Sequence, residues 1–132
     1  MKKRLTILAL ISTSCFASGT VEDVCKVEGG GVMAGYLCVE QKNEKAEKEF
    51  NENYQKVLIR LSEEETILRE SWSKVELVEP FQKAQRAWLS YRDAECFFSS
   101  VSSTTSPWQG VQIEECKLEM TLERVEYFKS IY

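Results

Sequence analysis

The residues of this sequence best suited to chemistry are its five cysteines, because the chain contains no histidine. Cys15 falls in an N-terminal leader that we expect to be removed, and the four that remain are typical of disulfides in an exported protein. Three connectivities are possible, and pairing between sequence neighbours fits the layout best, joining Cys25 to Cys38 and Cys96 to Cys116. Zinc is the competing use of four cysteines, but without histidine or a Cys-x-x-Cys pair we predict no metal site.

Carboxylates are the other candidates for chemistry, since the chain has 21 acidic residues. A glycosidase pair would have to flank a cleft about 5 to 9 Å across, with one carboxyl raised in pKa by apolar surroundings. Most of the acids instead fall on helix faces that the pattern predicts to be solvated. The chain also lacks histidine, the side chain that most often acts as a general acid or base. We therefore predict a protein that is not an enzyme and uses no cofactor.

The first residues have the layout of a secretory signal peptide, with a basic start at residues 1–4, an apolar run over 5–11 and small residues over 12–19. The apolar run is too short to span a bilayer, which needs roughly 20 apolar residues, and no later run qualifies. We predict cleavage after Ala17 or Gly19, which assigns residues 1–17 to the leader.

The mature chain is then a single domain over residues 18–132 in the periplasm. Lipidation at Cys15 is the less favoured alternative, because Ser12-Thr13-Ser14 offers no aliphatic residue three positions before the cysteine. The net charge is −4, and loss of the basic leader makes the domain more acidic still. Such acidity disfavours nucleic acid and anionic membranes, and it favours plain solvation or a basic partner.

Apolar residues spaced by three and four predict three long helices. The first begins near Tyr36, after a glycine-rich entry segment at 20–35 that we expect to be flexible. Its stripe comprises Ala46, Phe50, Tyr54, Val57 and Leu61. Ser62 followed by Glu65 is compatible with continuation of this helix or with a capping box that begins a new one.

The second helix has Pro80 in its first turn and ends near Ser99. Its predicted core stripe comprises Phe81, Ala84, Trp88, Tyr91 and Phe98. A polar loop over 99–110 leads to the third helix, from about Val111 to Ile131, whose stripe comprises Ile113, Cys116, Met120, Val125 and Phe128. The prediction is an all-α fold: a small antiparallel bundle of three long helices, with a short fourth as an option, stabilised by disulfides.

The sequence resembles the LprI-like lysozyme inhibitor family over roughly residues 25–128. The resemblance is carried by Ala84-Gln85-Arg86-Ala87-Trp88, Tyr91-Arg92-Asp93 and Cys96, by Cys38 with Phe50-Asn51-Glu52-Asn53-Tyr54 upstream, and by Cys116, Thr121 and Arg124 downstream. Two features differ: the segment from Glu63 to Glu79 is longer than expected, and a Ser/Thr run containing Trp108 replaces a glycine-rich loop. The chain is also similar to periplasmic immunity proteins that act against type VI lysozyme-like effectors.

The resemblance implies a helical, disulfide-bonded protein that inhibits a lysozyme-like glycoside hydrolase, from a host or from a bacterial effector. For contacts with that partner we select Trp108, the acidic triplet Glu63, Glu64 and Glu65, and Trp72. The signature residues are assigned to the fold, where they would tie adjacent helices together, for instance through Glu123 or Arg124; they are Arg86, Trp88, Arg92 and Asp93. The alternative function is a periplasmic adaptor that binds another protein in a bundle groove, and a homodimer is compatible with either.

Overall fold

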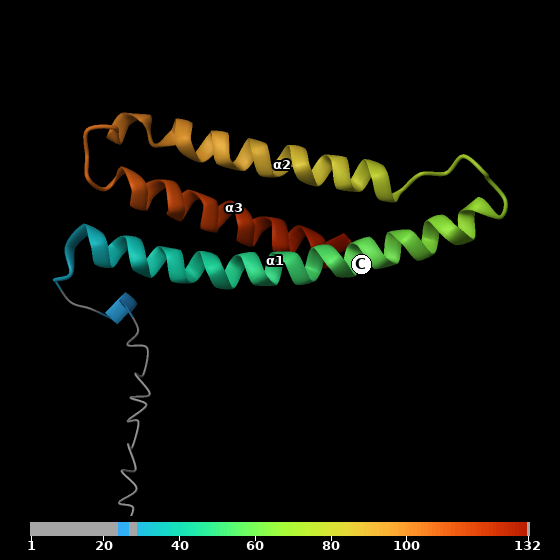
Figure 1. Cartoon of the computed structure of the whole chain (residues 1–132), viewed down its shortest axis with the longest axis horizontal. Coiled ribbons are helices and arrows are strands. Elements are labelled where there is room, and N and C mark those ends of the chain that lie inside the picture. The colour runs from blue at the N-terminus through green and yellow to red at the C-terminus, as the bar shows by residue number, and fades with distance from the viewer. Residues whose placement is uncertain (1–23, 27–28, 132) are drawn as a thin grey trace, which may run out of the picture.

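The computed structural model describes residues 24–26 and 29–131, and within these ranges every regular element is helical (Figure 1). The elements are a 3-10 helix at Val24–Lys26, α1 at Gly31–Arg69, α2 at Val78–Ser99, a 3-10 helix at Val101–Ser103 and α3 at Gln109–Ile131. The prediction of an all-α fold with three long helices is confirmed. The predicted signal peptide and Cys15 lie outside the described residues.

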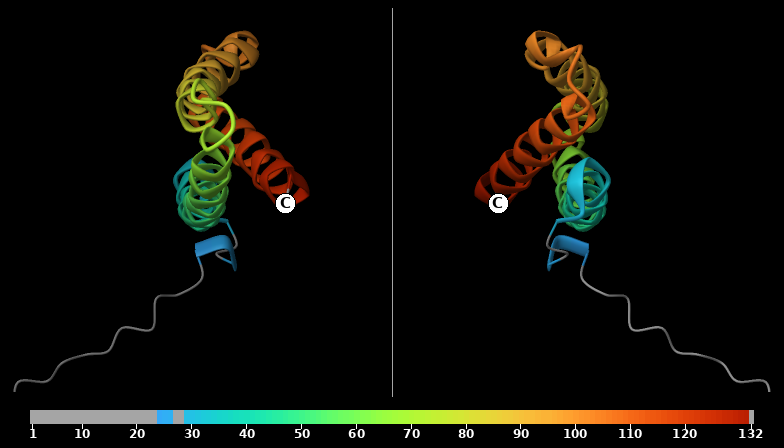
Figure 2. Two further views of the ribbon diagram at one scale, coloured as in Figure 1. Left: turned by 90° about the vertical axis from the view of Figure 1, so that its right-hand side faces the viewer. Right: turned by 90° about the vertical axis from the view of Figure 1, so that its left-hand side faces the viewer.

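The chain reverses direction at both long connections, so α2 runs opposite to α1 and α3 (Figure 1). The most extensive packing is between α1 and α3, and α2 contacts α3 more than it contacts α1. The end-on views show α3 crossing at an angle to the other two helices (Figure 2). None of the helices in the described part of the chain is both long and apolar enough to cross a membrane.

The first helix is longer than predicted at its start. It begins at Gly31 and includes Gly35, so the expectation of a flexible entry segment up to residue 35 is wrong for these residues. Glycines still make the turn into the helix: Gly29 before it and Gly31 at its first position have φ values of +76° and +63°, which only glycine adopts readily. The helix also continues through Ser62 and Glu65, so the capping-box alternative is wrong.

The core is an aromatic cluster shared by all three helices. Phe50 from α1 lies against Trp88 from α2 and Phe128 from α3, each with ring centroids 5.5 Å apart. Tyr54 stacks on Phe81 at the same centroid distance, and both rings contact Phe128. Such offset contacts add to the hydrophobic gain of burial. The predicted stripe of α1 therefore faces the core as expected.

The predicted core stripe of α2 is partly wrong. Ala84 is exposed, and Tyr91 and Phe98 expose 56% and 72% of their surface. The buried positions of α2 are instead Gln85, Arg92 and Cys96. Polar side chains are tolerated in the interior when hydrogen-bond partners are available. Arg92 finds partners on α1 and α3, and the Gln85 side-chain oxygen finds one on α3, whereas its Nε2 has no partner among the described residues.

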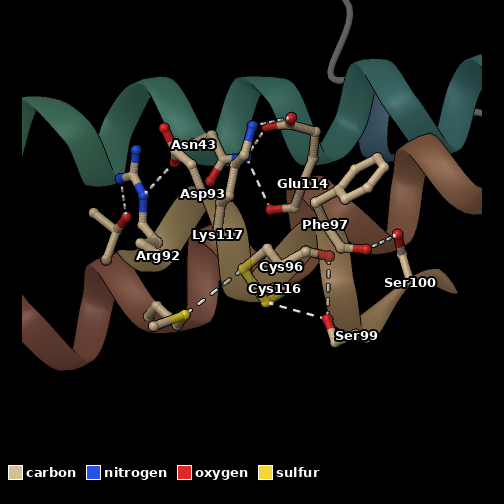
Figure 3. Close-up of a disulfide and its surroundings, with 12 residues drawn as sticks. Asn43, Arg92, Asp93, Cys96, Phe97, Ser99, Ser100, Glu114, Cys116 and Lys117 are labelled. Atoms are coloured by element: carbon tan, nitrogen blue, oxygen red, sulfur yellow. Dashed lines mark hydrogen bonds and ion pairs between the residues drawn. A yellow bond between two sulfur atoms is a disulfide. The ribbon is translucent and has the colours of Figure 1, made fainter. Parts of the chain in front are cut away.

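Two disulfides are present, in the pairs that sequence-local pairing predicts. Cys25–Cys38 attaches the N-terminal 3-10 helix to α1, and Cys96–Cys116 joins α2 to α3. Close to the second disulfide, the Asn43 side chain of α1 donates to the backbone and the carboxylate of Glu114 at 3.0 Å (Figure 3). Both cross-links therefore lie at the end of the molecule where α1 begins and α2 turns into α3 (Figure 1).

Candidate functional site

The predicted contact residues do not form one site. Trp108 lies against Gly35, near the start of α1, whereas Trp72 lies in the connection that follows the end of α1 at Arg69. The intervening stretch of helix is roughly 50 Å long at 1.5 Å per residue. A single hydrolase cleft cannot enclose both tryptophans, so they have to be considered separately.

Trp108 packs against its own domain. A Cβ atom added to Gly35 would lie 3.0 Å from Cζ3 of the indole, so the ring rests closely on the α1 backbone and a larger residue at position 35 would displace it slightly. Trp108 also lines a shallow hollow beside the Cys25–Cys38 disulfide. The ring keeps 44% of its surface exposed, and its contact with Gly35 places it against the start of α1.

Glu65 has a structural role at the other end. Its Oε2 accepts hydrogen bonds from the backbone N–H groups of Leu77 at 2.7 Å and Val78 at 2.9 Å. The start of α2 has no capping side chain of its own, so this carboxylate binds N–H groups that helix geometry leaves unpaired. The hydrogen bonds from Val78 and Leu77, with a smaller contribution from Arg69, hold the pKa of Glu65 below its ordinary value.

The α1–α2 connection is ordered by side chains of α1. Arg69 forms an ion pair with Glu65 at 2.7 Å and donates from Nε to the carbonyl oxygen of Val75 at 2.8 Å. The last turn of α1 thus contacts both the connection and the start of α2. The hairpin of the two helices is fixed by these contacts without a covalent cross-link.

The remaining candidates gather at this end, which we call the hairpin tip and define as residues 60–77. Glu63 and Glu64 are exposed, and Trp72 exposes 62% of its surface in the connection. A surface groove between α1 and the end of α3 has both acidic and apolar walls; it is lined by Arg60, Glu63, Glu64, Ile67, Leu68 and Ile131. The tip therefore presents carboxylates beside exposed apolar side chains.

The two exposed carboxylates of the tip are not placed as a glycosidase pair. Glu63 and Glu64 are adjacent on one helix, so they cannot flank a bond from opposite sides as a glycosidase pair must. Within residues 24–26 and 29–131, no group of three or more acidic or sulfur ligands could hold a metal ion. An acidic and apolar surface of this kind can contact a basic protein.

The signature residues of α2 lie mostly in the interior. Trp88 stacks on Phe50, and the guanidinium groups of Arg92 and Arg124 lie 5.5 and 5.4 Å from its ring centroid. Arg92 also donates to Thr121 of α3 at 2.8 Å and pairs with Glu47 of α1. Through one side chain, α2 is therefore connected to both other helices.

Other details of the signature differ from expectation. Asp93 accepts a hydrogen bond from its neighbour Arg92 at 3.1 Å and does not reach a second helix. The partner of Arg124 is Gln85, whose buried Oε1 accepts from its guanidinium. Arg86 is exposed and lines a surface hollow with Phe50 and Tyr54 of α1, and its predicted role in tying two helices stays a prediction. Gln85 was not among the residues predicted from the sequence, although its position within the Ala84–Trp88 signature segment could have indicated its importance.

Comparison with known proteins matches residues 31–128 to the family described as lysozyme inhibitor LprI. The chain belongs to the LprI family. The match runs from the first residue of α1 to Phe128, so the LprI unit includes all three helices and the aromatic core. A similar curated relative is an uncharacterized protein of Rhizobium meliloti (strain 1021), 25% identical over 96 residues that cover 72% of this chain and 69% of the relative. No solved structure gives a significant match.

Proposed function

We propose that this LprI protein is a periplasmic inhibitor, or immunity protein, that binds a lysozyme-like peptidoglycan hydrolase and blocks its glycan cleft. The observation that carries the proposal is the match to the lysozyme inhibitor family over α1, α2 and α3. Two disulfides suit a protein exported to an oxidising compartment. Inhibition is steric, so the protein contributes a rigid surface and no chemistry of its own.

The hairpin tip is the surface we assign to the hydrolase. Beyond the end of α3 the molecule narrows to two helices and their connection, a shape suited to entering a cleft (Figure 1). Trp72 and Ile67 expose 62% and 66% of their surface there, and buried tryptophans are common anchors of protein interfaces. Glu63 and Glu64 add negative charge that attracts a basic cleft.

The test of function is a cell-wall lysis assay in which the oxidised mature protein is titrated into a hydrolase. A basic animal lysozyme and a type VI muramidase effector serve as the two targets. We expect complete inhibition of one of them near a 1:1 ratio, together with a complex of that stoichiometry. If neither enzyme is bound or inhibited, the inhibitor proposal fails and the adaptor alternative takes its place.

The test of the surface uses two charge reversals on the same helix. Glu63→Lys with Glu64→Lys changes the hairpin tip, whereas Glu40→Lys with Glu44→Lys makes the same change in net charge at exposed positions near the other end of α1. We expect the tip variant to weaken inhibition about 10-fold, mainly through slower association, and the control to change it little. Equal effects of the two variants would assign the contact to another surface.

A further inference from the structure

The outer face of α2 carries an apolar stripe that nothing in the described chain covers. The stripe follows the three-and-four spacing of a helix–helix seam; its members are Ala84, Ala87, Tyr91, Ala94, Phe98 and Val101. All six are exposed, Phe98 to 72%, Tyr91 to 56% and Val101 to 51%. None of them carries a charge. Because the buried side of α2 faces α1 and α3, this seam is available to a helix from another molecule.

We propose that the seam is a homodimer interface in which α2 packs antiparallel against α2 of a second copy. The argument is self-complementarity. In an antiparallel pair centred between Arg92 and Asp93, the facing residues are Ala84 with Val101, Ala87 with Phe98, and Tyr91 with Ala94, each pair occurring twice by symmetry. Every layer thus opposes one alanine to one larger side chain.

Such alternation is what close helix packing requires, since a large side chain needs a small one opposite to it. A parallel pair in register would instead set Phe98 against Phe98 and alanine against alanine, leaving bulges and gaps. Val101 belongs to the short 3-10 helix after α2, so the outermost layer is less regular than the inner ones. The pattern of sizes therefore favours a second copy in the antiparallel orientation.

The exposed area is adequate for a dimer. Tyr91, Phe98 and the flanking Phe97 expose 56%, 72% and 61% of their surface. At roughly 200 Å² per aromatic side chain, these three rings and the smaller residues of the seam present about 600 Å² on each copy. The total of about 1,200 Å² is at the lower limit of specific, stable interfaces, so we expect a dimer that dissociates on dilution.

The first experiment measures mass in solution by light scattering and sedimentation over a range of concentrations. We expect the wild-type oxidised protein to approach the dimer mass at high concentration. Phe98→Asp should make it monomeric, whereas Ile59→Asp, a control at an α1 residue with 59% exposure, should leave the dimer intact. A monomer at every concentration, or a dimer that survives Phe98→Asp, overturns the proposal. Circular dichroism verifies that both variants fold.

The second experiment tests the orientation by cross-linking with a short bismaleimide, which does not attack the native disulfides. Ala87→Cys protein mixed with Phe98→Cys protein should give a cross-linked dimer. Either variant alone should not, because its two introduced thiols lie roughly 16 Å apart along an antiparallel pair. Efficient cross-linking of each variant alone indicates a parallel pair and overturns the antiparallel orientation.

The dimer is independent of the proposed inhibition, and the same variants separate the two. If Phe98→Asp abolishes the dimer and retains inhibition, the seam joins copies and the hydrolase binds elsewhere. If the wild type is monomeric and Phe98→Asp abolishes inhibition, the seam is the hydrolase surface and the dimer proposal is wrong.

Discussion

The two ends of the molecule are stabilised in different ways. One end holds both disulfides, the half-buried Trp108 and the contact between Asn43 and Glu114. The hairpin tip has no disulfide, and its geometry depends on hydrogen bonds and ion pairs of Glu65 and Arg69. Between them lies the aromatic core that all three helices share.

This difference is consistent with the disulfide end serving as the rigid scaffold and the hairpin tip as the binding surface. Covalent links at one end restrict the chain where α1, α2 and α3 meet, while the tip leaves Trp72 and Ile67 exposed to solvent. Stability and partner binding should therefore respond to substitutions at opposite ends.

Removal of the Cys96–Cys116 disulfide by a double serine substitution should lower the free energy of unfolding by about 3 kcal/mol, from loss of the cross-link in the unfolded chain. The same change at Cys25 and Cys38 should cost less than half as much. The 3-10 helix that Cys25–Cys38 attaches has no buried residue, so in the folded protein without this cross-link it gains freedom that offsets the loss. Urea titration measures both values, and equal losses would contradict this account.

The two tryptophans provide the next comparison. Trp72→Ala should weaken hydrolase binding about 30-fold, equivalent to about 2 kcal/mol for an interface anchor, and change stability little. Trp108→Ala should leave inhibition intact and lower the free energy of unfolding by about 2 kcal/mol, because its ring packs on Gly35. Titration calorimetry and urea unfolding measure the two quantities. A reversed pattern would place the binding surface at the disulfide end.

Apolar spacing predicts the core faces of α1 and α3 because those faces are mostly apolar. On α2 it succeeds only for Phe81 and Trp88, because the fully buried positions include Gln85 and Arg92, while Tyr91 and Phe98 of the predicted stripe point outward. Periodicity alone places the most apolar face of a helix in the core of the domain. It cannot recognise buried polar residues whose partners, such as Thr121, lie on another helix far along the chain.

The candidate site was predictable only in part. Ser62 and Glu65 have the spacing of a capping box, and Glu65 does cap a helix, but the helix is α2, which begins 13 residues later. Local spacing does not reveal where a chain will fold back. Likewise, Trp72 and Trp108 are both in connections, and only the structure separates the exposed ring from the packed one.

The Glu65 cap should make stability depend on pH in a defined direction. Because the pKa of Glu65 is lower in the folded protein, the unfolded chain binds its proton first as the pH falls. The stabilisation is therefore complete above the ordinary glutamate pKa of about 4.3, and it is lost as the pH drops through the folded value. Glu65→Gln should have a lower melting temperature than wild type at pH 7, and the difference should disappear in acid.

The neighbouring exposed Glu64 supplies the control for this comparison. Glu64→Gln removes the same charge from the same helix turn without touching the N–H groups of Leu77 and Val78. Its melting temperature should follow the wild type across the whole pH range. If both variants behave alike, the effect is one of net charge, and the noncovalent cap does not hold the hairpin tip.

The smallest expected effect is that of Gly35→Ala, where two opposing contributions nearly cancel. Alanine in place of a helical glycine gains about 1 kcal/mol of helix propensity. The new methyl group would stand 3.0 Å from the Trp108 ring, however, so the ring must move away and lose part of its packing. The free energy of unfolding should change by less than about 1 kcal/mol, a tolerance typical of small repacking. Tryptophan fluorescence should shift to the red as Trp108 becomes more exposed, whereas a clear stabilisation with unchanged fluorescence would show that the ring does not rest on α1.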